Sequence, residues 1–164
     1  MTTLEGASDV AGSVTGTASK IVEGALKAVH DVGTGLVRTV KGVVVGVVEG
    51  VGEVAQVTVG TLSDTVRAAI KGTGAIGADA TLTASGIAEG LITATKDTGV
   101  TLGEGAFALG RAAVSGVKEL GGDVIGTASG TVSGAIAGAA EIGGDALTAA
   151  KDTARGLVRG GGEV

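Results

Sequence analysis

Charged residues recur along this chain with a period of eleven. When the sequence is written in rows of eleven from Met1, the 12 basic and 17 acidic side chains occupy only repeat positions 1, 2, 5, 8 and 9. Random placement would give this result with a probability on the order of 10^-10, so the period is a property of the chain. Eleven residues make about three α-helical turns, and the five charged positions then form one arc on the helix surface. The pattern predicts an amphipathic α-helix.

Apolar residues fill the side of this helix opposite the charges. A β-strand is excluded, because an odd period would place alternate rows on opposite faces of a sheet. A β-solenoid with an eleven-residue coil would account for the many Val, Thr and Gly residues, but it would not group charges at spacings of three and four. The residues at repeat position 4 that we expect to form the apolar face are Leu26, Val37, Val48, Ile70, Ile92, Ile125, Ile136 and Leu147.

The sharpness of the period predicts the helix length. A helix with 3.6 residues per turn would drift and spread the charges around its circumference. The phase instead persists through glycine-rich segments such as 72–77, where a turn of arbitrary length would reset it. We therefore expect an all-α chain with one very long, Gly-rich amphipathic helix, about 245 Å long. It would span residues 1–164 as about fifteen repeats without separate domains. Helical hairpins, with the turn at 72–77, are the alternative.

Glycine placement predicts how such a helix is stabilised. The chain has 33 Gly, and each Gly in a helix costs about 1 kcal/mol relative to Ala, so the helix needs neighbours or an apolar surface. Repeat position 6 holds only Gly, Ala and Thr, and small residues let helix backbones approach closely. The expected seam between helices combines glycines at position 6 with two runs of glycines spaced by four, and contains Gly6, Gly42, Gly46, Gly50, Gly72, Gly105, Gly116, Gly126, Gly130, Gly134 and Gly138.

The arrangement of these positions favours association of the chain with itself. Positions 4 and 6 border the apolar arc on opposite sides, so a parallel copy would set large residues of one chain against small residues of the next. Such a heterologous contact propagates into a ring or an open filament, and we expect copies packed side by side in a bundle, tube or filament. Charges at positions 8 and 9 would pair between parallel neighbours, although a solvated face with an incidental bias in sign is an equal interpretation. The expected inter-helix charge pairs involve Lys41, Lys96, Lys118, Lys151, Asp97, Glu119 and Asp152.

Composition argues against several classes of function. Without Cys there is no disulfide, thiolate nucleophile or zinc knuckle. A net charge of -5 offers no basic surface for nucleic acid. Carboxylate pairs such as Glu49 and Glu53 lie on an exposed helix face that does not perturb them, and His30 has no second His or Cys nearby. We expect no enzyme, no cofactor, no metal and no nucleic-acid partner.

The sequence also bears on location. The first residues have neither a basic region nor an apolar core typical of a signal peptide. The longest uncharged run, 124–140, is shorter than the about 20 residues of a membrane-spanning helix. We expect a cytoplasmic protein, with the surface of a membrane, droplet or granule as the alternative location.

Three segments resemble the eleven-residue repeats of perilipins and synucleins. They are Thr95-Lys96-Asp97-Thr98, Ala150-Lys151-Asp152-Thr153 and the Val-rich and Gly-rich stretch 41–50, and the pattern covers the whole chain. The resemblance implies an extended helix that coats lipid droplets or membranes. The chain departs from those families in its net acidic charge, because their helices usually carry excess Lys for anionic lipid.

These observations favour one function and leave two alternatives. The first is a self-assembling helical scaffold whose apolar face or lumen is available to lipid-like molecules, with the chain itself as the main partner. The second is a peripheral coat protein that folds on a lipid or another apolar surface. The weakest is ice or surface binding through the threonines that recur every 22 residues at position 6, namely Thr17, Thr39, Thr61 and Thr83.

Overall fold

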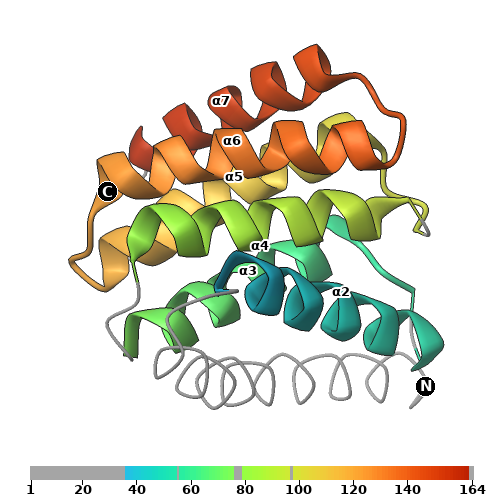
Figure 1. Ribbon diagram of the computed structural model, residues 1–164, viewed down its shortest axis with the longest axis horizontal. Helices are drawn as coiled ribbons and strands as arrows, with labels where there is room; N and C mark the ends of the chain where they lie inside the picture. Colours follow the sequence, from blue (N-terminus) through green and yellow to red (C-terminus); the bar gives the residue numbers. More distant parts are fainter. Residues whose placement is uncertain (1–35, 55, 76–78, 97, 163–164) are drawn as a thin grey trace.

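The chain folds into antiparallel helical segments. The computed structural model describes residues 36–54, 56–75, 79–96 and 98–162, and these contain six α-helices and no strand. The helices pack into a bundle (Figure 1), which confirms the all-α prediction. Their bounds are α2 Leu36–Val54, α3 Val59–Ala75, α4 Ala80–Thr95, α5 Leu102–Glu119, α6 Val124–Glu141 and α7 Ala146–Gly162.

The prediction of one uninterrupted helix is wrong for the described residues. The reason lies in the combined length of each helix and the turn that follows it. Helices α4, α5, α6 and α7 begin at positions 22 residues apart, which is twice the charge period. Each turn therefore brings the chain back in phase with the eleven-residue pattern, although the helix itself has ended. The hairpin alternative describes the fold better, and α3 ends at Ala75, within the expected turn segment 72–77.

Polar residues at repeat position 2 define where the helices begin. Asp79 Oδ1 accepts a hydrogen bond from Leu82 N at 3.0 Å, and Asp123 Oδ1 accepts one from Gly126 N at 2.9 Å. At the start of α5, Thr101 and Glu104 form a reciprocal capping box. Each cap satisfies a backbone N–H that has no partner inside the helix.

Glycines in the left-handed conformation end two of the helices. Gly121 and Gly143 have φ values of 68° and 69° and follow α5 and α6. The next residue in each case donates back into the helix, from Gly122 N to Val117 O at 3.0 Å and from Gly144 N to an alanine carbonyl at 2.8 Å. This is the hydrogen bonding of a Schellman C-cap, which a residue with a Cβ adopts poorly.

The helices form two layers in which alternate helices are neighbours. Helices α2, α4 and α6 lie side by side in one layer, and α3, α5 and α7 lie in the other (Figure 1). Because each turn reverses the chain, the helices within a layer run parallel, and the α4–α6 and α5–α7 contacts are the most extensive. Aliphatic side chains such as Val44, Leu62, Leu91 and Leu109 fill the core. We call this arrangement the stack.

We expect Asp123→Ala to lower the free energy of unfolding by about 1 kcal/mol, because it removes the side-chain cap of α6. Urea denaturation followed by circular dichroism measures the loss. The matched control is Asp64→Ala, which removes an exposed carboxylate from within α3. Equal losses in the two variants would contradict the role assigned to the cap.

Candidate functional site

Parallel helices in the stack approach each other at glycines. A Cβ added at Gly138 of α6 would lie 2.8 Å from Cβ of Ile92 on α4. One added at Gly134 would lie 2.7 Å from Cβ of Ala88 and would overlap the backbone oxygen of Ser85. The backbones of α4 and α6 are therefore closer than any side chain at these glycines would permit.

The same large-on-small contact occurs in the second layer. A Cβ added at Gly116 of α5 would lie 3.3 Å from Cγ2 of Ile70 on α3. Ile70 and Ile92 occupy repeat position 4, while Gly116 and Gly138 occupy position 6 and follow them by 46 residues. The contact expected between copies of the chain is thus present between helices of one chain.

This contact ends at the C-terminal end of the stack. Along α2 to α5 four of the position-4 residues, Val48, Ile70, Ile92 and Val114, are buried, whereas Val37 is half-buried and Val59 is 39% exposed. In the last two helices the corresponding side chains are exposed, Ile136 by 39% and Val158 by 77%. The apolar face is therefore covered at these four positions within the stack and exposed at the corresponding positions of α6 and α7. Its other members in these helices, Ile125 and Leu147, are 84% and 76% exposed.

The exposed side of α6 combines apolar surface with a lack of charge. We define the outer face of α6 as Ile125, Ala128, Ser129, Val132 and Ile136, all of which are exposed or partly buried. The first charged residue of α6 is Glu141, at its last position. Exposed apolar surface of this kind is typical of interaction sites.

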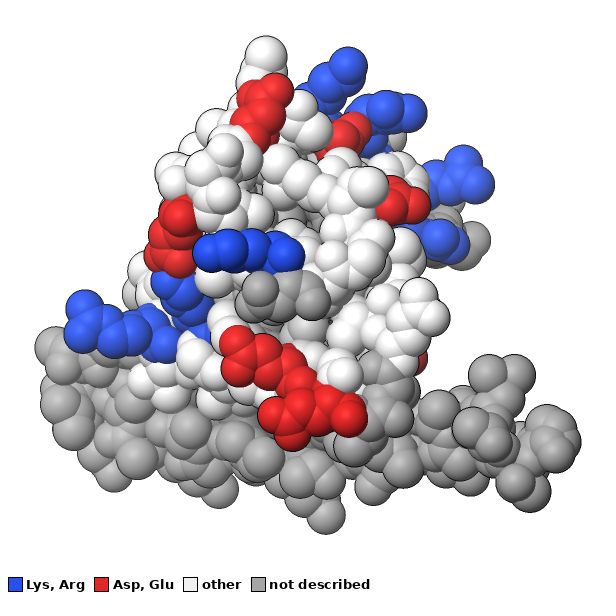
Figure 2. Space-filling model, turned by 90° about the vertical axis from the view of Figure 1, so that its right-hand side faces the viewer, with Lys and Arg blue, Asp and Glu red and all other residues white. Residues whose placement is uncertain are grey.

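Basic side chains concentrate on α5 and α7, in the layer formed by α3, α5 and α7. Figure 2 shows one group of Lys and Arg side chains at the upper right of the molecule, with Asp and Glu side chains among them, and further basic side chains at the centre and left. Helices α5 and α7 carry five of the basic residues of this net acidic chain. They are Arg111, Lys118, Lys151, Arg155 and Arg159.

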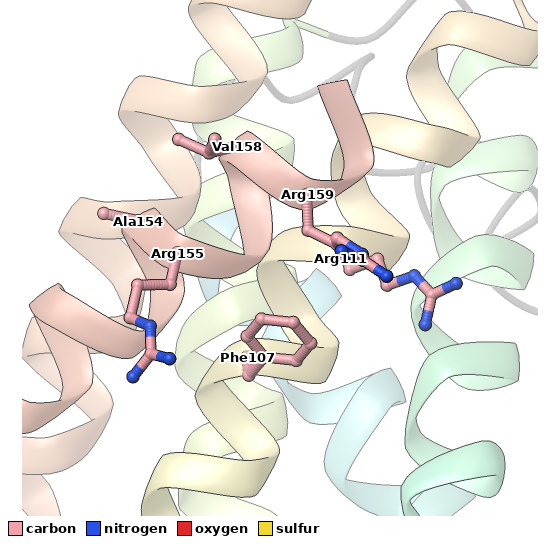
Figure 3. Close-up of a pocket in the computed structure, with 6 residues that line it drawn as sticks. All are labelled: Phe107, Arg111, Ala154, Arg155, Val158 and Arg159. Atoms are coloured by element: carbon pink, nitrogen blue, oxygen red, sulfur yellow. The ribbon is translucent and has the colours of Figure 1, made fainter. Parts of the chain in front are cut away.

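A groove of about 610 Å³ lies between α5 and α7 among these basic residues. Phe107 and Arg111 line it from α5, and Arg155, Val158 and Arg159 line it from α7 together with an alanine. In Figure 3 the ring of Phe107 lies between the side chain of Arg155 on one side and those of Arg111 and Arg159 on the other. Phe107 is the single Phe, Tyr or Trp residue of the chain.

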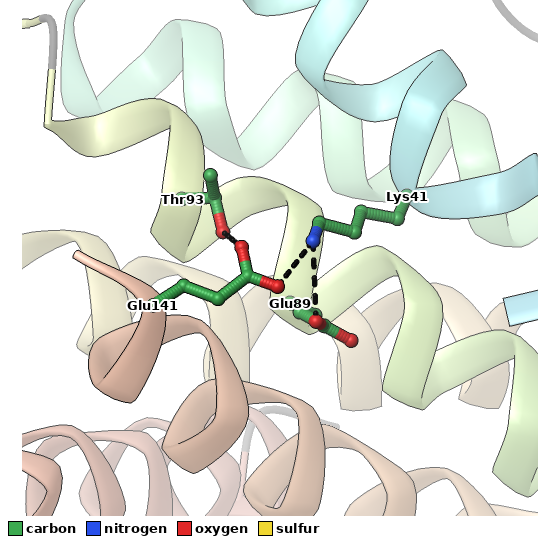
Figure 4. A network of polar contacts seen from close by, with 4 residues as sticks. All are labelled: Lys41, Glu89, Thr93 and Glu141. Atoms are coloured by element: carbon green, nitrogen blue, oxygen red, sulfur yellow. Dashed lines mark hydrogen bonds and ion pairs between the residues drawn. The ribbon is translucent and has the colours of Figure 1, made fainter. Parts of the chain in front are cut away.

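An ion cluster joins the three helices of the first layer. Lys41 Nζ of α2 pairs with Glu89 of α4 at 3.2 Å and with Glu141 of α6. Thr93 Oγ1 donates a hydrogen bond to the second oxygen of Glu141 at 3.1 Å (Figure 4). One ammonium group thus bridges carboxylates from two other helices.

The pKa values of the two carboxyl groups in this cluster are shifted in opposite directions. The hydrogen bond from Lys41 lowers the pKa of Glu141. Partial burial, together with the neighbouring carboxyl of Glu141, raises the pKa of Glu89 despite the lysine. The hydrogen bond to Glu141 in turn raises the pKa of Lys41. Glu141 is therefore the more strongly ionised partner of the lysine.

The remaining residues that were expected to pair between helices either bind other groups or are exposed. Lys118 Nζ donates to the backbone oxygen of Gly161 at 2.9 Å, at the end of α7. Asp152 pairs with Arg155 of its own helix at 3.5 Å. Exposed positions are occupied by Lys96, Glu119 and Lys151, while Asp97 lies outside the described residues.

The predicted seam glycines have several different surroundings. An added Cβ would lie 3.3 Å or less from another residue at Gly105, Gly116, Gly126, Gly130, Gly134 and Gly138. An added Cβ would meet nothing within 4 Å at Gly42, Gly46 and Gly50. Gly72 is buried, and two predicted residues, Gly6 and Leu26, lie outside the described part of the chain.

Sequence reasoning missed two glycines that contact α2. Gly86 and Gly90 of α4 approach the backbone oxygens of Val37 and Lys41, at 2.7 Å and 2.8 Å from an added Cβ. Their repeat positions, 9 and 2, are the same as those of the predicted seam glycines Gly130 and Gly134. A search at a spacing of 44 residues would have found them, because Gly130 and Gly134 follow Gly86 and Gly90 at that distance.

Two further observations concern the described residues as a whole. Among them, no group of three or more His, Cys, Asp or Glu side chains is placed to hold a metal ion. None of the described helices is long and apolar enough to cross a membrane.

Comparisons with known proteins identify no relative of this chain. No protein-family model matches it, and no curated protein or solved structure matches it significantly. The resemblance to perilipin and synuclein repeats therefore stays a prediction.

We expect Gly134→Ala to destabilise the protein by about 2 kcal/mol, because the added methyl group would overlap α4. The control Gly46→Ala adds the same group where nothing lies within 4 Å, and helix propensity predicts a gain of about 0.5 to 1 kcal/mol there. Urea denaturation measures both values. Stabilisation by both substitutions would show that the α4–α6 contact is not as close as described.

We expect Lys41→Met to lower the free energy of unfolding at pH 7 by up to about 1 kcal/mol, since the cluster is partly exposed to solvent. Glu141 has a lowered pKa in the folded state, so its contribution is present above the ordinary carboxyl pKa and is lost as the pH falls through the folded value. Glu89 has a raised pKa, so its neutral form favours folding at low pH and this contribution is lost as the pH rises.

The difference between the parent and Lys41→Met should therefore shrink on acidification below about pH 4, where the carboxyl groups become protonated. Denaturation at several pH values tests this, with Lys96→Met as the control because that lysine is exposed. A difference that persists unchanged at low pH would assign the effect to packing of the lysine side chain instead of its charge.

Proposed function

We propose that the protein is a structural scaffold that assembles with copies of itself, and that a second copy extends the stack from the outer face of α6. The observation that carries the proposal is the large-on-small contact between parallel helices. It covers Ile70 and Ile92 within the chain, whereas Ile136 at the equivalent place in α6 is exposed.

The equivalence of the helix faces supports this proposal. Ala84, Ala88 and Ile92 of α4 are buried beneath α6. The residues 44 positions later, Ala128, Val132 and Ile136, form the outer face of α6 and are more exposed. The outer face of α6 thus repeats a surface that already binds a parallel helix in the same molecule.

The surface that would complement this face is present on α2. Within the stack, Gly86 and Gly90 of α4 bring that helix against α2, and Gly42 and Gly46 of α2 precede them by 44 residues. Gly42 and Gly46 are exposed. If α2 of a second copy packs on α6 as α6 packs on α4, where Gly134 meets Ser85, then Gly46 of that copy lies against Ser129.

The polarity of this contact determines the kind of assembly. The outer face of α6 and the glycines of α2 are different surfaces, on the last and the first of the described helices in one layer (Figure 1). A contact between unlike surfaces leaves one of each free, so it adds copies in an open series or closes into a ring. This accords with a scaffold and not with a closed dimer.

We expect Ile136→Asp to reduce assembly of the purified protein, because it places a charge in a face that the next copy must desolvate. Sedimentation velocity in lipid-free buffer measures the size distribution. The matched control is Leu82→Asp, which adds the same charge at a residue of α4 that is 47% exposed and outside this face.

Cross-linking tests the register independently, since the chain contains no cysteine. Chains with Ser129→Cys mixed with chains with Gly46→Cys should form a disulfide between copies, whereas Ser129→Cys mixed with Ser63→Cys should not. A parent protein that stays monomeric in lipid-free buffer contradicts the scaffold. Helical particles that form only when lipid vesicles are added would support the lipid-coat alternative.

A further inference from the structure

Helix α2 has the composition least suited to a helix among the described helices. Nine of its 19 residues are Val and four are Gly. It contains no Ala, whereas every other described helix contains at least three. Val and Gly rank well below Ala in helix propensity, and Val is among the residues that favour strands. The helical state of α2 therefore depends on contacts with the rest of the molecule.

Contacts with α4 supply most of this support. A Cβ added at Gly90 of α4 would lie 3.1 Å from Cβ of Val44, so the two helices pack closely. Among the described helices, α4 has neighbours on both sides in its layer, α2 and α6, whereas α2 has α4 on one side (Figure 1). The buried residues on the apolar side of α2 are Val40, Val44, Val47, Val48 and Val51.

The ion cluster attaches α2 at a second point. Lys41 pairs with Glu89 at 3.2 Å and with Glu141 (Figure 4). All three side chains are partly exposed to solvent, and exposed ion pairs contribute little to stability. Local opening of α2 therefore requires the loss of one helix contact and of a weak ion cluster.

Residues 43–48 within α2 have the composition of an intermolecular strand. They read Val-Val-Val-Gly-Val-Val and carry no charge. Segments of six or seven residues with high β-propensity, no charge and no Pro are typical of stacked sheets between copies of a chain. The eleven-residue period excludes strands that keep one face through several repeats, and a segment shorter than one repeat is not subject to that argument.

Close helix packing is the alternative explanation for this composition. It accounts for Val44 and Val48, which are buried and must be small where the backbones approach. It does not account for Val45, which is half-buried, because Leu or Ala at that place would favour the helix. The preference of the segment for a strand is therefore greater than packing requires.

We propose that α2 is a conformational switch. In the bundle it is a helix held by α4, and when local opening detaches it, residues 43–48 become a β-strand that pairs with the same segment of other copies. Hydrogen bonds between copies then satisfy the backbone groups that the helix satisfied internally. The inference does not rest on assembly through the outer face of α6, because it requires only that α2 detach.

The experiment uses the full chain at a urea concentration just below its unfolding transition. Hydrogen exchange read by mass spectrometry reports the opening of each helix, while thioflavin T fluorescence and infrared spectroscopy report strand formation. Ile136→Asp is measured beside the parent, so that loss of assembly and loss of switching are separated. We expect the amides of α2 to exchange before those of α4, and strands to form in both proteins.

We expect Val45→Glu to slow strand formation by about tenfold or more, because the added charge would repeat at every copy along the sheet. The matched control is Leu82→Glu, which adds the same charge to α4 at a residue that is 47% exposed. Strand formation by this control should proceed at the rate of the parent.

A second variant tests the helical side of the switch. An added Cβ at Gly46 meets nothing within 4 Å, so Gly46→Ala favours the helix and should slow strand formation by about twofold to fivefold. The control Gly161→Ala makes the same change near the end of α7, where an added Cβ also meets nothing within 4 Å. This control should not slow it.

Four results would overturn the inference. They are exchange of α2 no earlier than that of α4, opening of α2 without strand formation, equal rates for Val45→Glu and Leu82→Glu, or strand formation by the parent and not by Ile136→Asp. The last result would assign the strands to the assembled state. Circular dichroism before incubation verifies the fold of each variant, and Gly46→Ala keeps the test decisive should Val45→Glu fail to fold.

Discussion

One kind of contact organises this bundle. A large aliphatic side chain of one helix packs against a glycine of the next parallel helix in the same layer. The chain has one large aromatic residue and 33 glycines, so it cannot fill a core with bulky rings. Ile92 against Gly138 and Ile70 against Gly116 show the alternative. Backbones that approach closely gain many dispersion contacts, and these offset the low helix propensity of glycine, about 1 kcal/mol per residue relative to alanine.

Much of the local structure could be predicted from the sequence. The eleven-residue charge pattern identifies the helices, and the contrast between positions 4 and 6 anticipates contacts such as Ile92 with Gly138. The helix ends could not be found in this way. Asp79 and Asp123 occupy a position of the charged arc and look like surface residues of a continuous helix. Because the units are two periods long, the turns leave no trace in the phase of the charges.

The functional surfaces were harder to predict from the sequence, because they depend on how the helices pack against one another. The sequence offers pairing of Lys41 with an acid of a parallel chain as one of two equal interpretations, but the choice of Glu89 and Glu141 follows from the register of α2, α4 and α6 within one layer. Arg111 and Arg155 occupy the same repeat position, 44 residues apart, and appear in the sequence as a solvated face. The α5–α7 contact brings both to one groove. No one-dimensional pattern distinguishes a solvated arginine from one beside a groove.

The ion cluster affects how the stack can come apart. In many repeat architectures each unit contacts only its neighbours, so stability is a sum of local terms and end units fray independently. Lys41 instead contacts Glu89 one helix away in its layer and Glu141 two helices away. Detachment of α6 would therefore alter the charge balance at α2 as well as at α4. This three-helix bridge links α2 to α6 directly, in addition to the contacts that each of them makes with α4.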